Sequence, residues 1–293
     1  MGLTERARAQ SGRRKWPSFA CDTQNTGATP ARPPETSPAI EWTAEVNGAV
    51  LSTAAIADER VIVGDETGVL HALNALSGER LWTFDTADRI RSTPTVRNGT
   101  VVVGSDDGTL YGLSTTGEHY WEFETEGPIV ASPALVDGTV YAGSYDGTVY
   151  AIDVTNGDPV WMTETGGLIA SSAAVADDTV YLGSSDQQMY ALDAATGESV
   201  WQTEVEAEIA ASPAVSGGTV FINTGSGETY AFDARSGNQR WSFEMDGMAG
   251  TSPAVMDGTV YLSEGLTGTR VHAVSVTTGT HRWTVNTEAA VQG

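Results

Sequence analysis

The residues of this sequence that could do chemistry are four histidines, one cysteine and a series of aspartates in short turn-like stretches. The stretch SDDGT at 105–109 has some likeness to a calcium loop, and Asp146 and Asp186 stand in similar stretches. Calcium takes six to eight oxygen ligands, and the corresponding stretches of two later repeats read GSG and GLT. We therefore interpret Asp106, Asp107 and their counterparts as hairpin-turn residues rather than metal ligands.

The histidines fall at two kinds of position within a repeated pattern. His71 and His272 stand where other copies carry tyrosine, so they are predicted to pack in the interior. His119 and His281 come two residues before a tryptophan, at a variable position that is expected to face solvent. No two histidines have the spacing of metal ligands.

Composition excludes several classes of function. The 293 residues include 38 acidic and 15 basic ones, for a net charge of −23, and Lys15 is the only lysine. Such a surface repels phosphate backbones and anionic lipids, so nucleic-acid binding is not expected. The sequence contains no run of 18 apolar residues, so no membrane span is predicted. Cys21 is the only cysteine, so an internal disulfide is impossible.

The distribution of charge suggests a tail and a high-salt environment. Residues 1–15 hold five of the basic residues and are predicted to be a disordered basic tail, whereas 16–293 form a single domain. Concentrated salt shortens the Debye length to about 3 Å at 1 M and would screen the acidic self-repulsion. We therefore expect a protein adapted to high salt. The N-terminus carries no signal peptide as written, which predicts a cytoplasmic protein unless the true start lies upstream, in which case it would be extracellular or at the cell surface.

A period of about 40 residues organises the chain. Tryptophans recur at this spacing, and each closes the motif Ala-x-Asp-x-x-x-Gly-x-x-x-Trp or a close variant, as in ALDAATGESVW. A repeat of this length with strand-like content indicates propeller blades. In one copy the runs IVASPALV, TVYAGS, TVYAID and VWMTET are separated by Asp-Gly pairs and one longer turn. Asp-Gly between such runs predicts hairpins, so each repeat is expected to form one four-stranded antiparallel blade.

The motif has a structural explanation. The acidic or polar residue can bond the turn backbone, the glycine closes the turn, and the indole is expected to lie across small residues of a neighbouring blade. Burying one indole removes about 150–250 Å² from water, which stabilises by roughly 4–6 kcal/mol at most. The predicted docking residues are Trp42, Trp82, Trp121, Trp161, Trp201, Trp241 and Trp283.

Both ends of the chain suggest an unfinished blade. Six full repeats cover about residues 49–287, while 39–46 (AIEWTAEV) read as a lone fourth strand. Residues 287–293 align with the segment that precedes the next inner strand. We predict an all-β propeller with six full blades and an incomplete seventh closed by the termini, using the strand of Trp42 and a short C-terminal strand, with a strand at Trp16 as a further candidate. The alternative is a truncated eight-bladed propeller.

The repeat resembles that of the pyrroloquinoline-quinone (PQQ) propeller superfamily, and WPSFACDTQNTG at 16–27 looks like the opening segment of its haloarchaeal members. In quinoprotein dehydrogenases of this superfamily, PQQ lies over the funnel with calcium, a disulfide of adjacent cysteines and a stacking tryptophan. This chain departs from that pattern because it has one cysteine and about half the length, and because its repeat tryptophans serve the blade edges. These departures from the family pattern predict that the chain binds no cofactor. PQQ with calcium is the alternative.

The remaining expectation concerns partners. Loops that join one blade to the next surround the funnel, and in the second of them Arg89 and Arg91 stand out because basic residues are scarce. They either pair with neighbouring carboxylates or hold an anionic ligand or acidic segment. We predict a monomeric, non-catalytic platform for unidentified protein partners. The alternatives are a PQQ-dependent dehydrogenase and a sensor domain for a small ligand.

Overall fold

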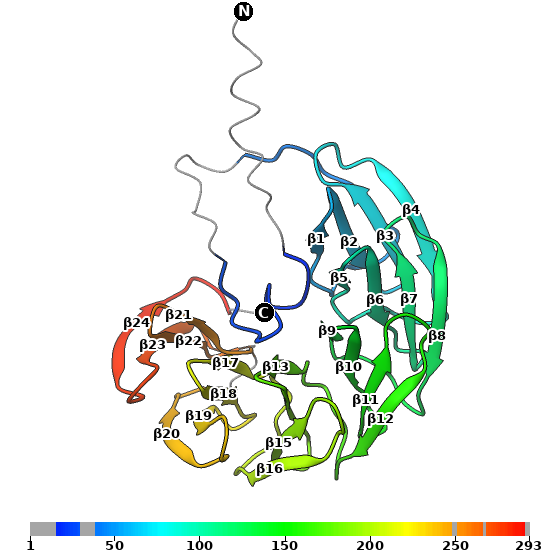
Figure 1. The fold of residues 1–293 in the computed structure, drawn as a ribbon. Coiled ribbons are helices and arrows are strands. Elements are labelled where there is room, and N and C mark those ends of the chain that lie inside the picture. Colours follow the sequence, from blue (N-terminus) through cyan, green and yellow to red (C-terminus); the bar gives the residue numbers. More distant parts are fainter. Residues whose placement is uncertain (1–15, 30–38, 248–250, 266–267, 291–293) are drawn as a thin grey trace, which may run out of the picture.

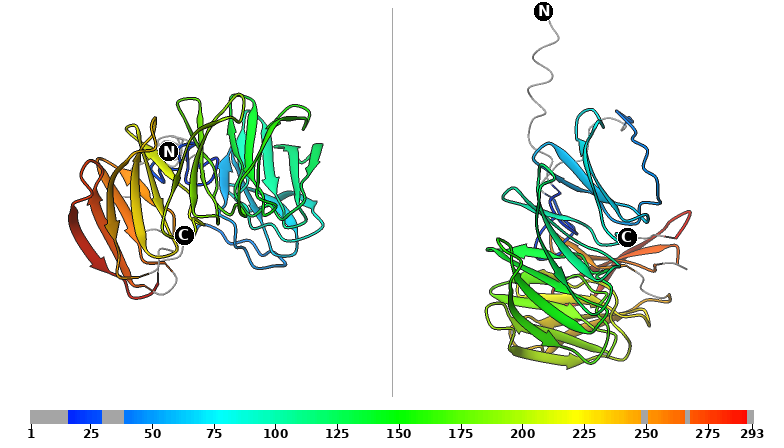
Figure 2. Two further views of the ribbon diagram at one scale, coloured as in Figure 1. Left: turned by 90° about the horizontal axis from the view of Figure 1, so that it is seen from below. Right: turned by 90° about the vertical axis from the view of Figure 1, so that its right-hand side faces the viewer.

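Six four-stranded antiparallel sheets follow one another along the chain and confirm the predicted propeller architecture. A computed structural model describes residues 16–29, 39–247, 251–265 and 268–290. The predicted tail at 1–15 lies outside these residues. Blades 1 to 6 are the sheets β1–β4, β5–β8, β9–β12, β13–β16, β17–β20 and β21–β24, and they stand in an open arc around a central channel (Figures 1 and 2).

Each blade runs outward from a short strand at the channel. The inner strands are β1 (Ala55–Ala57), β5 (Thr95–Arg97), β9 (Ala134–Val136), β13 (Ala174–Ala176), β17 (Ala214–Ser216) and β21 (Ala254–Met256). The second strands are β2 (Arg60–Gly64), β6 (Thr100–Gly104), β10 (Thr139–Gly143), β14 (Thr179–Gly183), β18 (Thr219–Asn223) and β22 (Thr259–Ser263).

The two outer positions of each blade complete the sheet. The third strands are β3 (Val69–Asn74), β7 (Thr109–Ser114), β11 (Thr148–Asp153), β15 (Gln188–Asp193), β19 (Glu228–Asp233) and β23 (Arg270–Ser275). The outermost strands are β4 (Arg80–Asp85), β8 (His119–Glu124), β12 (Pro159–Glu164), β16 (Ser199–Glu204), β20 (Gln239–Glu244) and β24 (His281–Asn286). None of the described residues is helical, and so no described helix could cross a membrane.

The hydrophobic core lies between the blades. Each of its five clusters combines residues of two adjacent blades, because both faces of an inner sheet are covered. The third strand is buried through most of its length in each blade, as in Val149–Ile152 of β11. A small residue on the third strand faces the tryptophan of the same blade, for example Ala151 opposite Trp161, and a β-bulge follows directly.

The indoles lie against the turn of the next blade. Trp201 Nε1 donates to the carbonyl oxygen of Ala234 at 2.9 Å, and a Cβ added to Gly237 would lie 2.7 Å from the indole Cδ2. Corresponding bonds from Trp42, Trp82, Trp121, Trp161 and Trp241 end on Ala75, Thr115, Val154, Ala194 and Val276. The neighbouring small residue under the ring is thus the turn glycine, whereas the alanine of the motif belongs to the ring's own blade.

The two ends of the arc differ from the sequence-based expectation. Trp16 forms a single bridge with Ile56 of β1 in the channel, so it contributes no strand to a seventh blade. Residues 39–46 dock Trp42 on blade 1 but pair with no described strand, and residues 287–290 are not a strand either. Six sheets are therefore present in the described residues. Trp283, at the free end, remains 44% exposed.

Candidate functional site

The chain's own N-terminal segment, residues 16–27, runs through the channel, and we call it the channel segment (Figure 1). Its backbone carbonyl groups accept hydrogen bonds from the middle residue of the inner strand in five blades. Trp16 O accepts from Ile56, Pro17 O from Val96, Thr23 O from Val175, Gln24 O from Val215 and Thr26 O from Val255, at 2.5–2.8 Å. The segment therefore links blades that are far apart in sequence.

One aspartate organises the turn within this segment. Asp22 Oδ1 accepts the N–H groups of Gln24 and Thr26, each at 3.0 Å, and the Thr26 hydroxyl donates to Asp22 Oδ2. The buried Asn25 side chain donates to the carbonyl oxygens of Ser172 and Ala173 in blade 4. Burial, with the neighbouring Asp22 charge, raises the pKa of the Cys21 thiol, so this cysteine is not an activated nucleophile.

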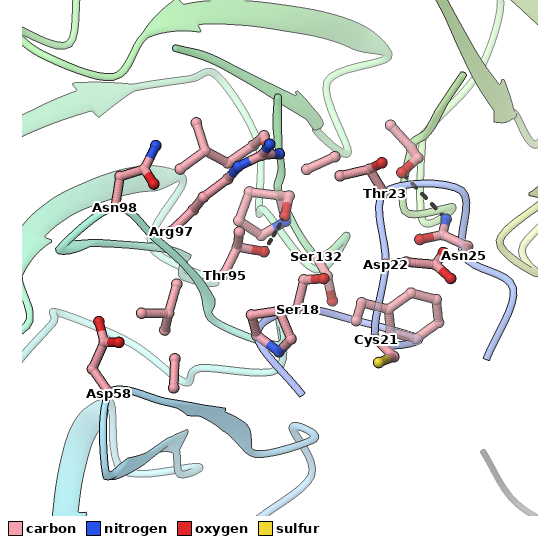
Figure 3. Close-up of a pocket in the computed structure, with 18 residues that line it drawn as sticks. Ser18, Cys21, Asp22, Thr23, Asn25, Asp58, Thr95, Arg97, Asn98 and Ser132 are labelled. Carbon is pink, nitrogen blue, oxygen red and sulfur yellow. Dashed lines mark hydrogen bonds between the residues drawn. The ribbon is translucent and has the colours of Figure 1, made fainter. Parts of the chain in front are cut away.

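A cavity of about 350 Å³ lies beside the channel segment and is lined mainly by residues of the segment and of blades 2 and 3 (Figure 3). Ser18, Asp22 and Thr23 of the segment line one side, and Arg97 of β5 and Leu135 of β9 line the other. Asp58 and Asn98, in the hairpins that join the first strand of a blade to its second strand, also line this cavity. The cavity therefore lies at the end of the channel where these hairpins are. Blade 3 is also the blade whose inner strand forms no described backbone bond with the segment.

A series of hydrogen bonds to hydroxyl groups links the six blades at the opposite end of the channel. In blades 1 to 5 the backbone N–H before the inner strand donates to the hydroxyl of the equivalent residue in the next blade, at 2.9–3.2 Å. The series runs Thr53, Thr93, Ser132, Ser172, Ser212, Ser252. These residues line a second cavity of about 240 Å³, and Phe19 of the channel segment lies between the two cavities because it lines both.

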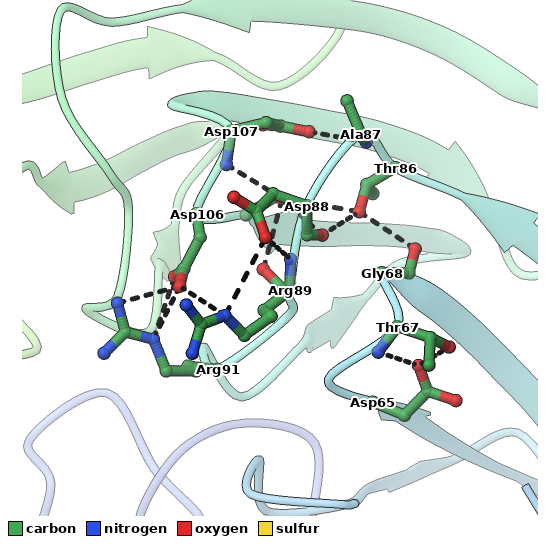
Figure 4. A network of polar contacts seen from close by, with 11 residues as sticks. Asp65, Thr67, Gly68, Thr86, Ala87, Asp88, Arg89, Arg91, Asp106 and Asp107 are labelled. Atoms are coloured by element: carbon green, nitrogen blue, oxygen red, sulfur yellow. Dashed lines mark hydrogen bonds and ion pairs between the residues drawn. The ribbon is translucent and has the colours of Figure 1, made fainter. Parts of the chain in front are cut away.

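The two arginines singled out from the sequence lie together at this second mouth (Figure 4). Arg91 Nε donates to both carboxylate oxygens of Asp106, at 2.9 and 2.8 Å, and Arg91 Nη2 lies 2.8 Å from Oδ2. The guanidinium also lies 6.0 Å from the centre of the Tyr145 ring. Arg89 is more loosely held, with Nε 3.8 Å from Asp88 and from Asp106. Its side chain is 52% exposed.

The turn aspartates bridge blades rather than gather around a metal. Asp146 Oδ2 accepts the Tyr150 hydroxyl at 2.7 Å and the N–H of Glu126 at 3.1 Å, while Oδ1 accepts the N–H of Thr148. Asp107 and Asp186 make the same contacts in their blades. Burial and the bond to the acid raise the pKa of Tyr150 to about 12. The described residues contain no cluster of three or more acidic, histidine or cysteine side chains that could hold a metal ion.

Two buried histidine–acid pairs were missed by sequence reasoning. His71 Nε2 lies 2.9 Å from Asp65 Oδ2, with both side chains almost fully buried, and His272 Nε2 lies 3.1 Å from Glu264 Oε1. Although desolvation opposes it, hydrogen bonds from Thr67, His71 and backbone N–H groups lower the pKa of Asp65 to about 2. A signal was available, because in both blades where histidine replaces tyrosine, an acid replaces the serine or threonine that follows the second strand.

The other two histidines lie on exposed outer strands. His119 stacks on Phe84 with ring centres 5.5 Å apart, and His281 stacks on Phe243 at 6.2 Å. Both residues are exposed at the blade edge. None of the four histidines faces either cavity.

Channel and blades together define a propeller built from PQQ-like repeats. The family model described as "Outer membrane protein assembly factor BamB" matches residues 7–168 and 164–293, and the chain belongs to this family. No curated protein matches the sequence.

Solved structures share the fold at low sequence identity. BamB from Moraxella catarrhalis superposes with a TM-score of 0.78 at 24% identity, covering 87% of this chain and 82% of that one. A europium-containing methanol dehydrogenase gives 0.77 at 14% identity, covering 86% and 73%. The computationally designed protein Ika8 gives 0.65 at 16% identity, covering 84% and 89%. The same architecture thus occurs in an enzyme and in proteins that are not named as enzymes.

Proposed function

We propose that this chain is a non-catalytic propeller that serves as a platform for protein partners. The observation that carries the proposal is the occupied channel. Polypeptide backbone runs along the axis and is bonded to five of the six inner strands, which supports a structural use of the channel. The family assignment and the likeness to BamB agree with this proposal.

The residues around the channel do not fit PQQ with calcium. The wall at the connecting-loop end consists mainly of alanine, serine and threonine, with Phe19 projecting from the channel segment. Arg91, the charged residue of that cavity, is already bonded to Asp106. Calcium needs six to eight oxygen ligands, and the described carboxylates form no such cluster.

A spectroscopic titration tests the non-catalytic half of the proposal. The purified chain is titrated with PQQ and Ca²⁺ and followed by absorbance, and dye-linked oxidation of alcohols and sugars is measured in parallel. We expect no saturable spectral change and no oxidation. A saturable spectral change or turnover above the PQQ-and-Ca²⁺ blank would overturn the proposal and favour the dehydrogenase. Thermal-shift screening with small metabolites tests the sensor alternative in the same way.

Charge reversal at the channel mouth tests the platform half. Arg89 is half-exposed and only loosely paired, so Arg89→Glu should disturb a partner without disturbing the blade. Arg235, exposed on a turn between third and fourth strands, supplies the matched control Arg235→Glu. A partner captured from source-cell extract should be retained by the control and lost with Arg89→Glu. Equal retention by both variants would remove this surface from the proposal.

A further inference from the structure

Blade 3 breaks the pattern by which the channel segment pairs with the inner strands. Leu135 of β9 lies opposite Val140, in the same register as Val175 opposite Val180, whose N–H donates to Thr23 O at 2.5 Å. N–H groups at this register point away from the second strand and into the channel. No described residue accepts a hydrogen bond from the Leu135 N–H, and Leu135 lines the 350 Å³ cavity. The Leu135 N–H of blade 3 is therefore available at the cavity, whereas the equivalent N–H groups of the other five blades donate to the channel segment.

A guanidinium lies beside this donor. Arg97 Nη1 donates to the Leu135 carbonyl oxygen at 3.0 Å, which holds the side chain along the cavity wall. The described arginines that form ion pairs are Arg89, Arg91, Arg240 and Arg270. Arg97 has no carboxylate partner among the described residues, although the chain carries a net charge of −23. Its remaining N–H groups are available to a ligand.

The acidic residues around the cavity limit the charge of that ligand. The Asp22 carboxylate is used by Gln24 and Thr26 within the channel segment. Asp58 stands exposed at the rim, and its charge disfavours a polyanion. One carboxylate therefore suits the cavity better than a phosphate-rich ligand. A volume of about 350 Å³ is near the lower limit of ligand sites, which suits the end of a chain.

We propose that this cavity binds the carboxyl terminus of a partner polypeptide. Arg97 holds the terminal carboxylate, and the Leu135 N–H donates to it or to the last peptide carbonyl, as the other inner strands donate to the channel segment. Backbone pairing and capture of a terminal carboxylate are both known modes of peptide recognition. This inference rests on the proposed role as a protein platform and gives that role a site and a chemical class of partner.

Matched peptides test the proposal on the full chain. N-acetylated trialanine, with either a free carboxylate or a terminal amide, is titrated by isothermal calorimetry, and a second pair ends in leucine. We expect the acids to bind at least about tenfold more tightly than the amides, a factor that one charge-assisted contact supplies. Equal affinity of acid and amide, or no binding of either pair at millimolar concentration, overturns the proposal.

Variants assign the two contacts. Arg97→Gln should remove the preference for the acid, whereas Arg235→Gln, an exposed arginine away from the cavity, should leave it unchanged. Leu135→Pro removes the N–H at a position outside the β9–β10 ladder and should weaken acid and amide alike, with Leu135→Val as its control. An unchanged preference in a folded Arg97→Gln protein contradicts the assignment. The comparison of acid and amide peptides uses the native chain and so does not depend on the folding of a variant. The PQQ titration has an independent outcome, so a failure of the proposed function can be told from a failure of this inference.

Discussion

Replacing Trp201 by alanine tests whether the indoles hold adjacent blades together. Trp201 is 9% exposed, whereas Trp283 occupies the same motif position at the end of the arc and is 44% exposed. Truncating a buried tryptophan costs about 3–5 kcal/mol. Because Trp283 has little more than half of its surface covered and bonds to no further blade among the described residues, Trp283→Ala should cost about half as much. The expected difference is about 2 kcal/mol.

The turn glycine under the indole provides a second measurement. A Cβ on Gly237 would lie 2.7 Å from the Trp201 Cδ2, and its φ is +69°. Gly218 has nearly the same φ, +71°, but open space where the Cβ would be. Alanine at either position bears the strain of left-handed backbone, about 1–2 kcal/mol. Gly237→Ala should therefore cost more than Gly218→Ala, and the excess measures the contact with the indole.

Urea denaturation at fixed KCl concentration, followed by circular dichroism, measures these changes. Repeat arrays can unfold in steps, so amide exchange of β18 and β19 in the next blade accompanies each variant. Equal loss of stability in Trp201→Ala and Trp283→Ala, with unchanged exchange in blade 5, would refute the docking role of the motif.

Four further predictions address charge, titration and the channel. Screening of acidic repulsion predicts a melting temperature that rises between 0.1 and roughly 2 M KCl, and a flat or falling profile contradicts it. The pKa of Asp65 is depressed to about 2 in the folded protein, so its ionised form stabilises the fold at pH values above its ordinary pKa. Asp65→Asn should therefore lower the free energy of unfolding by about 2 kcal/mol at pH 7. This loss should fade as the pH falls from 4 to about 2. Tyr150, with a pKa raised to about 12, should ionise late in an alkaline absorbance titration, together with Tyr111, Tyr190 and Tyr230. Its stabilising effect is complete below pH 10 and lost toward pH 12. Tyr150→Phe should cost about 0.5–1.5 kcal/mol and reduce the amplitude of the late step by about a quarter. Deleting residues 1–27 should increase amide exchange at the five bonded inner strands but leave the Leu135 amide, which the segment does not bond, at its native rate, as read by hydrogen-exchange NMR.

The blades could be predicted from the sequence because their signals are local. A hairpin needs glycine or aspartate at a fixed turn position, and the indole needs a glycine about 35 residues later, so a 40-residue period carries both. The channel segment could not be predicted in this way. It binds through backbone carbonyl groups, as Thr23 and Gln24 do, and a backbone acceptor leaves no side-chain pattern to read.

The site was only partly accessible for the same reason. Arg89 and Arg91 stood out as scarce charges, and the structure shows Arg91 bonded to Asp106. Arg97 did not stand out, because what distinguishes it is its place on the cavity wall and its bond to the Leu135 carbonyl oxygen. Both are properties of the folded chain. A lone fourth strand at 39–46 was expected, but without three further strands beside it no ladder forms.

The free end of the arc gives the protein a built-in optical reporter. Four indoles at equivalent positions, those of Trp121, Trp161, Trp201 and Trp241, are less than 10% exposed, while Trp283 keeps 44% of its surface in water. Its emission should therefore be red-shifted and readily quenched by iodide. Whatever comes to cover β24 would shift that emission to the blue, without any label having been attached.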